Sequence, residues 1–455
     1  MIVNHSRESE MKKIKLGVAA VALMASAVAL AKGGAQDCLA GRTDKDIPDY
    51  APGETMTFTV ETRGFEGADL AHWKIGWERT ADDGRKESGE APADRPFVYR
   101  TSLDRPGFVR LTGSLIGADG KPVKKSGIRG KTVSVQFDLG AGVEILKIRQ
   151  AVPAPADFDA LWAKHKANLA TVAWKDGVQL KEIASPTAGV RLYEFSIPCY
   201  GGKPATGHLA VPEKEGRYPV TLKFFGYYES WTFNRAIAPP SKLDRNQISM
   251  FVSAHGFEMG HDEAYYRAER AKVKSNGFGH GFDPEQNADP EKTYYAGMTY
   301  RILRALEYVK TRPEWNGKDI VVRGGSQGGL QSIWAAALDH DVTACDVSIP
   351  WNCDIGGTEL GRNRGDWYVK WVPALGYYDT CSMAPRIPKT CRVTVSMAGL
   401  GDYTCPPTGV MAFYNALTCP KSILFVQNAR HGSRLQGEPV QRFRIDGDKV
   451  TAVGK

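Results

Sequence analysis

One stretch of the sequence, DIVVRGGSQGGLQSIWAAALDHD at residues 319–341, restricts the fold more than any other. An apolar, β-branched run leads into Ser326, and an alanine-rich run of helical character follows it directly. Four glycines surround this serine: Gly324, Gly325, Gly328 and Gly329. Glycine destabilises the interior of a helix or strand. A group of four glycines therefore indicates that the local geometry or the function requires them. The G-x-S-x-G pattern in this context is typical of a sharp strand-to-helix turn that presents a serine above the edge of a sheet.

The hydrophobic pattern of the chain changes near residue 150, and its length suits two domains. Residues 42–145 consist of short, roughly alternating runs separated by turn-forming pieces, which predicts a small immunoglobulin-like β-sandwich. A proline-rich segment at 150–158 marks the boundary. Strands and helices then alternate, which predicts an α/β domain over 150–440 with a mostly parallel sheet flanked by helices. We expect residues 441–455 to form a C-terminal tail.

The N-terminus has the features of a secretory signal peptide. A cationic segment that begins at Met11 precedes an apolar, uncharged run, which ends in a cleavage-type A-L-A at residues 29–31. The run is too short and too rich in small residues for a stable membrane span. We therefore predict a signal peptide over residues 1–31, with Met11 as an alternative start, and a secreted or periplasmic protein.

Charge and cysteine spacing argue against several classes of partner. The formal net charge of +8 is spread along the chain without a basic block that interleaves aromatic residues, so nucleic acid is not expected. The eight cysteines contain no C-x-x-C, and we expect neither a metal nor an organic cofactor. Cys381 with Cys391, and Cys405 with Cys419, are near enough in sequence to bridge after export, and buried free thiols are the alternative.

A serine hydroxyl needs a base and an orienting acid before it becomes a good nucleophile. In this architecture the acid and then the histidine follow the serine, each in a loop after a later strand. His431 follows an apolar strand-like run, whereas His340 closes the helix that begins at the serine. Asp402 is the matching acid. Asp346 and Asp354 are rivals that come early after the turn.

The negative charge that develops on a reacting carbonyl oxygen calls for two backbone N–H donors. One is expected from Gln327, the residue after the nucleophile, and the other from Tyr227, in the loop after an early strand. Tyr228 and Trp351 are candidates for stacking on a sugar ring, and ordinary aromatic packing is the alternative for both.

Several separated segments resemble the acetyl xylan esterase and cephalosporin C deacetylase family, carbohydrate esterase family seven. The likeness covers about residues 150–435, and these segments carry it: PADFDALW, FFGYYES, RGGSQGG, VSIPWNCD, GLGDYTCPP and FYNALTCPKSI. The resemblance implies an α/β-hydrolase fold and deacetylation of sugar esters by a Ser-Asp-His triad. Those roles fall here on Ser326, Asp402 and His431, with Tyr227 and Gln327 as oxyanion donors.

The chain also departs from the pattern of that family. It reads AHGFEMG at 254–260 where the family usually has D-x-R-G-Q-G, and Gly432 follows His431 where the family usually has a glutamate. The β-rich N-terminal domain is an addition to the family's pattern. A homo-oligomer is compatible with the resemblance, and this added domain would affect how such an oligomer assembles. These departures concern the acyl acceptor more than the chemistry.

The hypothesis from sequence is thus a secreted serine esterase that removes O-acetyl groups from oligo- or polysaccharides without a cofactor. Two alternatives are another acyl hydrolase on the same fold, such as a peptidase or a conjugate deacylase, and a non-catalytic glycan-binding protein.

Overall fold

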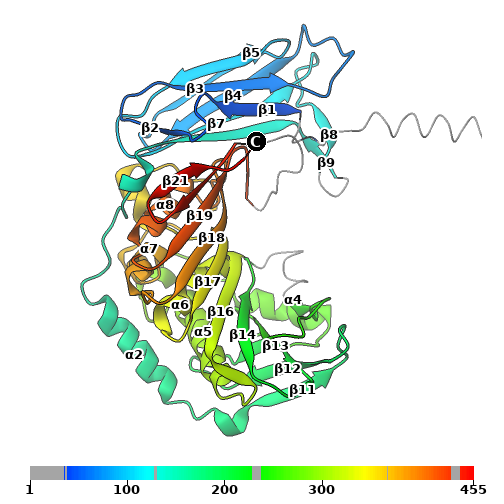
Figure 1. The fold of residues 1–455 in the computed structure, drawn as a ribbon, viewed down its shortest axis with the longest axis vertical. Coiled ribbons are helices and arrows are strands. Elements are labelled where there is room, and N and C mark those ends of the chain that lie inside the picture. Colours follow the sequence, from blue (N-terminus) through cyan, green and yellow to red (C-terminus); the bar gives the residue numbers. More distant parts are fainter. Residues whose placement is uncertain are drawn as a thin grey trace, which may run out of the picture.

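The structure, a computed structural model, describes residues 35, 38–127, 131–227, 237–365, 367–431 and 441–454. A β-sandwich lies at one end of the molecule, against a larger domain built around one twisted sheet (Figure 1). The predicted signal peptide lies outside the described residues. Within the described ranges, no helix combines the length and the apolar character that crossing a bilayer requires.

The sandwich consists of two sheets whose inner faces share one hydrophobic core. The first sheet has the order β1-β3-β6, with bounds Leu39–Thr43, Met56–Thr62 and Phe97–Thr101. The second has the order β2-β10-β7-β4-β5, with bounds Asp49–Tyr50, Gln136–Val143, Gly107–Ile116, Lys74–Ala81 and Lys86–Pro92. A short hairpin joins β8 (Lys124–Ser126) and β9 (Thr132–Ser134). This division of strands matches an immunoglobulin-like sandwich, with the first sheet as A-B-E and the second built around G-F-C.

The second domain confirms the predicted α/β-hydrolase class. Its sheet has, among the described residues, eleven strands in the order β11-β12-β13-β15-β14-β16-β17-β18-β19-β20-β21. The central six, β15 to β19, run parallel. Their bounds are Ile248–Val252 (β15), Tyr218–Phe224 (β14), Trp315–Ser326 (β16), Ala344–Pro350 (β17), Arg392–Gly399 (β18) and Lys421–Val426 (β19). Antiparallel strands extend it on one side: β11 (Gln179–Ile183), β12 (Val190–Ile197) and β13 (Ala205–Pro212).

The C-terminal residues correct one prediction. Residues 441–455 were expected to form a tail, but Arg442–Asp446 (β20) and Lys449–Ala452 (β21) form an antiparallel hairpin that continues the sheet beyond β19. Phe443 and Ile445 point into the core and are 1% and 0% exposed, while their neighbours are exposed. The hairpin therefore gains stability from burying these two side chains.

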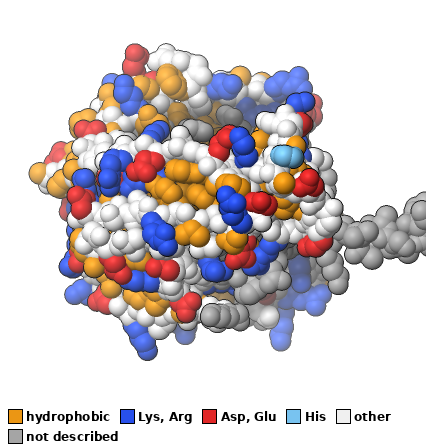
Figure 2. Space-filling model, turned by 90° about the horizontal axis from the view of Figure 1, so that it is seen from above, with side chains coloured by type: hydrophobic (Ala, Val, Ile, Leu, Met, Phe, Trp, Pro, Cys, Tyr) orange, Lys and Arg blue, Asp and Glu red, His pale blue; other side chains and the backbone are white. Residues whose placement is uncertain are grey.

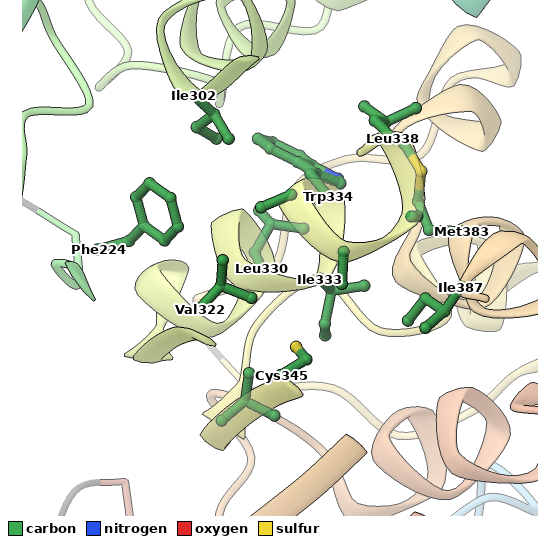
Figure 3. Packing of buried hydrophobic residues seen from close by; sticks show 14 of the residues in the cluster. Phe224, Ile302, Val322, Leu330, Ile333, Trp334, Leu338, Cys345, Met383 and Ile387 are labelled. Atoms are coloured by element: carbon green, nitrogen blue, oxygen red, sulfur yellow. The ribbon is translucent and has the colours of Figure 1, made fainter. Parts of the chain in front are cut away.

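Helices line one side of the sheet in Figure 1, where α2, α5, α6, α7 and α8 lie next to one another. Their bounds are Phe158–Ala170 (α2), Tyr294–Lys310 (α5), Gln327–Leu338 (α6), Thr380–Met383 (α7) and Pro407–Ala416 (α8), and α4 covers Glu263–Lys272. Every residue of α6 is buried. Trp334 packs there among apolar residues of several elements, including Ile302 and Met383 (Figure 3), and its indole N–H donates to Tyr378 O at 2.9 Å. This packing fixes the helix that begins at Ser326.

The surface carries both signs of charge. In the view of Figure 2, Lys and Arg side chains are interspersed with Asp and Glu. Cys381, Cys391, Cys405 and Cys419 are free thiols, so neither of the two pairs suggested by sequence spacing is bridged.

Candidate active site

Ser326 lies at the end of β16, at the turn into α6, in a backbone conformation that costs energy. Its φ is 57° and its ψ is −123°, a region that costs a non-glycine residue about 1–3 kcal/mol. The turn is also crowded. A Cβ at Gly324 would lie 2.4 Å from Gly328 O, and one at Gly328 would lie 2.4 Å from Phe224 O. Glycine is therefore required on both sides of the serine, as the G-x-S-x-G pattern predicts.

The structure brings Ser326, His431 and Asp402 together. His431 Nε2 is 3.1 Å from Ser326 Oγ, and His431 Nδ1 is 3.0 Å from Asp402 Oδ2. The imidazole is 32% exposed and the carboxylate is fully buried. One ring nitrogen therefore meets the serine hydroxyl and the other meets a buried acid, which is the arrangement of a serine nucleophile with its base and orienting acid.

Asp402 is fixed by its own loop, which follows β18. Its Oδ1 accepts hydrogen bonds from the backbone N–H groups of Thr404 and Cys405, both at 3.0 Å. The second oxygen, Oδ2, bonds to the imidazole. The backbone donors thus hold the carboxylate in the orientation that the histidine needs.

The two rival acids have other partners. Asp346, on β17, forms an ion pair with Arg392 at 3.1 Å. Asp354 accepts from the backbone N–H of Ala151 at 2.7 Å and pairs with Arg362. Neither is hydrogen-bonded to His431 in the described structure, so the geometry favours Asp402.

Tyr227 and Gln327 both contact one buried histidine, His280. The Tyr227 ring stacks on the His280 ring with centroids 3.9 Å apart and planes 6° from parallel. The Gln327 side-chain amide lies 3.2 Å from His280 Nε2 through its nitrogen. Gln327 is the first residue of α6, so its N–H has no acceptor within the helix and is available to a ligand. His280 therefore links the two residues that were expected to supply oxyanion donors.

His280 was not identified from the sequence. It is 3% exposed, and burial lowers its pKa to about 3, so it is neutral at ordinary pH. His255, from the divergent AHGFEMG segment, contacts it edge to face at 4.5 Å and bonds to Tyr294 Oη at 2.6 Å. Burial, then the nearby His280, holds the pKa of His255 well below its usual value. The departure at 254–260 from the expected family pattern was the available sequence signal for this part of the site.

The loop that carries His431 is held by the sandwich domain. Gly140 on β10 donates its N–H to Gln427 Oε1, and its carbonyl accepts from Gln427 Nε2, both at 2.8 Å. The Gln427 side-chain amide therefore binds the β10 backbone through both its donor and its acceptor. Asp138 donates its backbone N–H to Asn428 Oδ1 at 2.8 Å. Its buried carboxylate is 3.2 Å from Arg430 Nε, next to His431. The N-terminal domain thus helps to place the imidazole.

The same loop offers one group of side chains whose geometry suits a cation. Among the described residues, ligand atoms of Asp402, Cys405 and His431 all lie within 4.8 Å of one another. Burial raises the pKa of the Cys405 thiol, which disfavours the thiolate that a metal needs. Both Asp402 oxygens already accept hydrogen bonds, so this group is better suited to orienting the histidine.

Aromatic side chains gather beside Tyr227. Trp351 and Trp367 contact the Tyr227 ring edge to face, with centroids 6.0 and 5.2 Å away. Trp351 is 3% exposed and donates its indole N–H to Trp367 O, so it supports Trp367 instead of offering a free face to a sugar. Trp367 and Tyr368 are 43% and 48% exposed and are better placed for stacking. Tyr228 lies outside the described residues.

The chain is similar to known proteins. The acetyl xylan esterase (AXE1) family model matches residues 136–358 and 365–445. Acetyl esterase Axe7A of Xylanibacter ruminicola is 29% identical over 357 residues, which are 74% of this chain and 73% of that protein.

Two solved structures share the fold. The acetyl xylan esterase from Paenibacillus sp. R4 superposes with a TM-score of 0.52 at 24% identity, over 64% of this chain and 94% of that one. Acetyl xylan esterase 1 from Thermoanaerobacterium sp. JW/SL YS485 gives 0.51 at 22%, over 64% and 93%. The sandwich strands β1–β9 precede the region that the family model matches.

Proposed function

Because this chain belongs to the acetyl xylan esterase family and is a carbohydrate esterase, we propose that it removes O-acetyl groups from oligo- or polysaccharides through an acyl-enzyme on Ser326. The observation that carries the mechanism is the continuous relay from Ser326 Oγ through both nitrogens of His431 to Asp402. With Nδ1–H donating to the buried Asp402, Nε2 is left as the acceptor for the serine proton.

In the first step His431 takes the proton of Ser326 as Oγ attacks the acetyl carbonyl carbon. The carbonyl oxygen becomes negative, and the backbone N–H groups of Gln327 and Tyr227 are the donors that we assign to it. Each such donor stabilises the transition state by about 2.7–4 kcal/mol. His431 then passes its proton to the sugar oxygen, the sugar hydroxyl leaves, and an acetyl ester remains on Ser326.

In the second step a water molecule takes the place of the sugar. His431 accepts its proton, the hydroxide attacks the acetyl ester, and acetate leaves as the proton returns to Ser326. The imidazole is partly exposed, so water can reach this side chain. Water and the acetylated saccharide are the reactants, and the chain's own residues supply the nucleophile, the base and the oxyanion donors.

The test is acetate release from acetylated xylan oligosaccharides and from p-nitrophenyl acetate by the full chain and by its Ser326→Ala variant. We expect the wild type to act on both substrates and the variant to lose both activities. Wild-type rates in the variant would contradict the mechanism. Activity that rises with acyl length, or cleavage of peptides in place of acetylated saccharides, would contradict the substrate class.

We also propose that the protein is exported, since a cationic start, an apolar run and an A-L-A site precede the sandwich. N-terminal sequencing of the mature protein from its native host tests this. Cleavage directly after Ala31 is expected, and an intact N-terminus in the cytoplasm would contradict it.

A further inference from the structure

The outer face of the five-stranded sandwich sheet forms one wall of a cavity of about 790 Å³. This volume lies within the range of roughly 300–1,000 Å³ that is usual for small-ligand sites. Its floor is a row of directly paired residues, one from each of four strands: Gln136, Ser114, Gly76 and Glu90. A second row, two residues along, runs from Asp138 to Ser88. With strands about 4.8 Å apart, each row crosses about 14 Å of sheet.

Strand alternation gives this face its polarity. Phe137, Leu111 and Ile75 point from the same strands into the sandwich core and are fully buried. Their neighbours on the outer face are polar or have no side chain. The sheet is therefore apolar on one side and hydrogen-bonding on the other.

The cavity adjoins the candidate active site. Arg430, which directly precedes His431, lines the cavity together with Asp138 and Gln136. These two residues of β10 bind the Arg430 guanidinium. A ligand lying along the two rows would therefore have one end beside the loop that carries the imidazole and the other at the edge strand β5.

Much of the hydrogen-bonding capacity of this face is unused. The side chains of Glu78, Ser88, Thr112 and Ser114 all line the cavity, and none of them hydrogen-bonds to another described residue. Ser88, Thr112 and Ser114 have short side chains, which leave the floor low between longer ones, while Ile116 Cδ1 covers Gly76. Such a surface matches a ligand that brings its own donors and acceptors.

The charges of the lining indicate an uncharged ligand. Asp138 is neutralised by Arg110, at 2.8 and 2.7 Å, and by Arg430. The carboxylate of Glu78 also interacts electrostatically with Arg110. Glu90 is paired with Lys74 at 2.7 Å. The lining therefore has no excess of positive or negative charge that would attract a strongly anionic or strongly cationic ligand.

We propose that this outer sheet face is a subsite for a neutral glycan chain, which binds the part of the acetylated saccharide that does not react. The proposal rests on the proposed function, because its ligand is the substrate of that reaction. Binding energy from a non-reacting part of a substrate can raise kcat/KM at the reacting ester. The subsite would thus make the enzyme prefer long saccharides over single sugars.

The first experiment compares kcat/KM for long acetylated xylan oligosaccharides and for p-nitrophenyl acetate in two variants, Ser88→Trp and Glu78→Gln. Both residues lie on β4 or β5, away from Arg430. We expect Ser88→Trp, which fills the cavity, to lower kcat/KM for the oligosaccharide about tenfold and to leave p-nitrophenyl acetate within about twofold. Glu78→Gln should give a smaller loss in the same direction.

Thr59→Trp is the matched control, since Thr59 lies on β3 in the opposite sheet and is absent from the cavity lining. It should leave both substrates unchanged. Equal losses on both substrates in Ser88→Trp, or no loss on either, would overturn the subsite.

A binding measurement separates this inference from the proposed function. Calorimetry with deacetylated xylan oligosaccharide, on Ser326→Ala and on the double variant that adds Ser88→Trp, requires no turnover. Binding that the second substitution abolishes supports the subsite even if the wild type released no acetate. Binding that survives the second substitution, no binding in either variant, or binding of peptides alone would overturn it.

Discussion

The carboxylate of Asp138, on strand β10 of the sandwich, lies 3.2 Å from the guanidinium of Arg430, the residue directly before His431. Asp138 is 3% exposed and also forms a bidentate pair with Arg110. Charge-assisted pairs of this kind fix geometry as well as adding energy. The N-terminal domain is therefore part of the support for the imidazole, in addition to forming a wall of the neighbouring cavity.

Arg430→Ala is expected to lower kcat for p-nitrophenyl acetate by about 10- to 100-fold, because a small displacement of the imidazole has a large effect on proton transfer. KM should change little, since Arg430 is not expected to touch this small ester. Steady-state kinetics on the full chain measure both. Arg444→Ala, at an exposed position on β20, serves as the control. An unchanged kcat in Arg430→Ala would contradict the positioning role.

Asp402→Asn should lower kcat roughly 10,000-fold while the fold is retained, because the amide no longer fixes the tautomer of His431. Asp346→Asn is the matched control at the rival carboxylate and should keep kcat within about twofold of the wild type. The measurement is p-nitrophenyl acetate turnover together with the melting temperature of each variant. A larger loss in Asp346→Asn than in Asp402→Asn would reverse the assignment.

His280→Phe should keep the ring that stacks on Tyr227 and remove the hydrogen bond to the Gln327 side chain. We expect kcat to fall about tenfold with KM nearly unchanged, since the oxyanion donors matter more in the transition state than in the bound substrate. His280→Gln, which can restore a hydrogen bond but not the stack, should recover part of the loss. Equal effects on kcat and KM would indicate a substrate contact instead.

Stability should fall in acid partly because His280 resists protonation. Burial lowers its pKa from 6.5 to about 3, so between these values the unfolded chain binds a proton that the folded chain does not. The stabilisation is therefore present above pH 6.5 and is lost as the pH falls from 6.5 towards 3. Melting temperatures recorded from pH 7 to pH 4 should decline less steeply in His280→Phe than in the wild type. Parallel curves would contradict this assignment.

The parts of this structure that could be predicted from sequence are those with local signals. The crowded turn around Ser326 is encoded by adjacent residues, and the chain order of acid and histidine follows from the parallel strands that carry them. The sandwich was visible in its alternating strands. The hairpin at 442–452 was missed, although Phe443 and Ile445 alternate with charged residues and Gly447 at the turn has a φ of 60°.

The remaining features depend on contacts between distant segments. Nothing near His280 in the sequence shows that Tyr227 and Gln327 both contact it. The burial of Trp351 beneath Trp367 is likewise a tertiary result, so the sequence could not decide between stacking on a sugar and packing. The link from Asp138 to Arg430 spans two domains, so local sequence patterns could not predict the role of the sandwich.

The central claim is that Ser326 is an activated nucleophile, and covalent labelling tests it most directly. A fluorophosphonate applied to the full chain should add one phosphonyl group, which peptide mass spectrometry should locate on Ser326. Ser326→Ala should remain unlabelled, and His431→Ala should label far more slowly. An unlabelled wild type, or equal labelling of Ser326→Ala, would contradict the account.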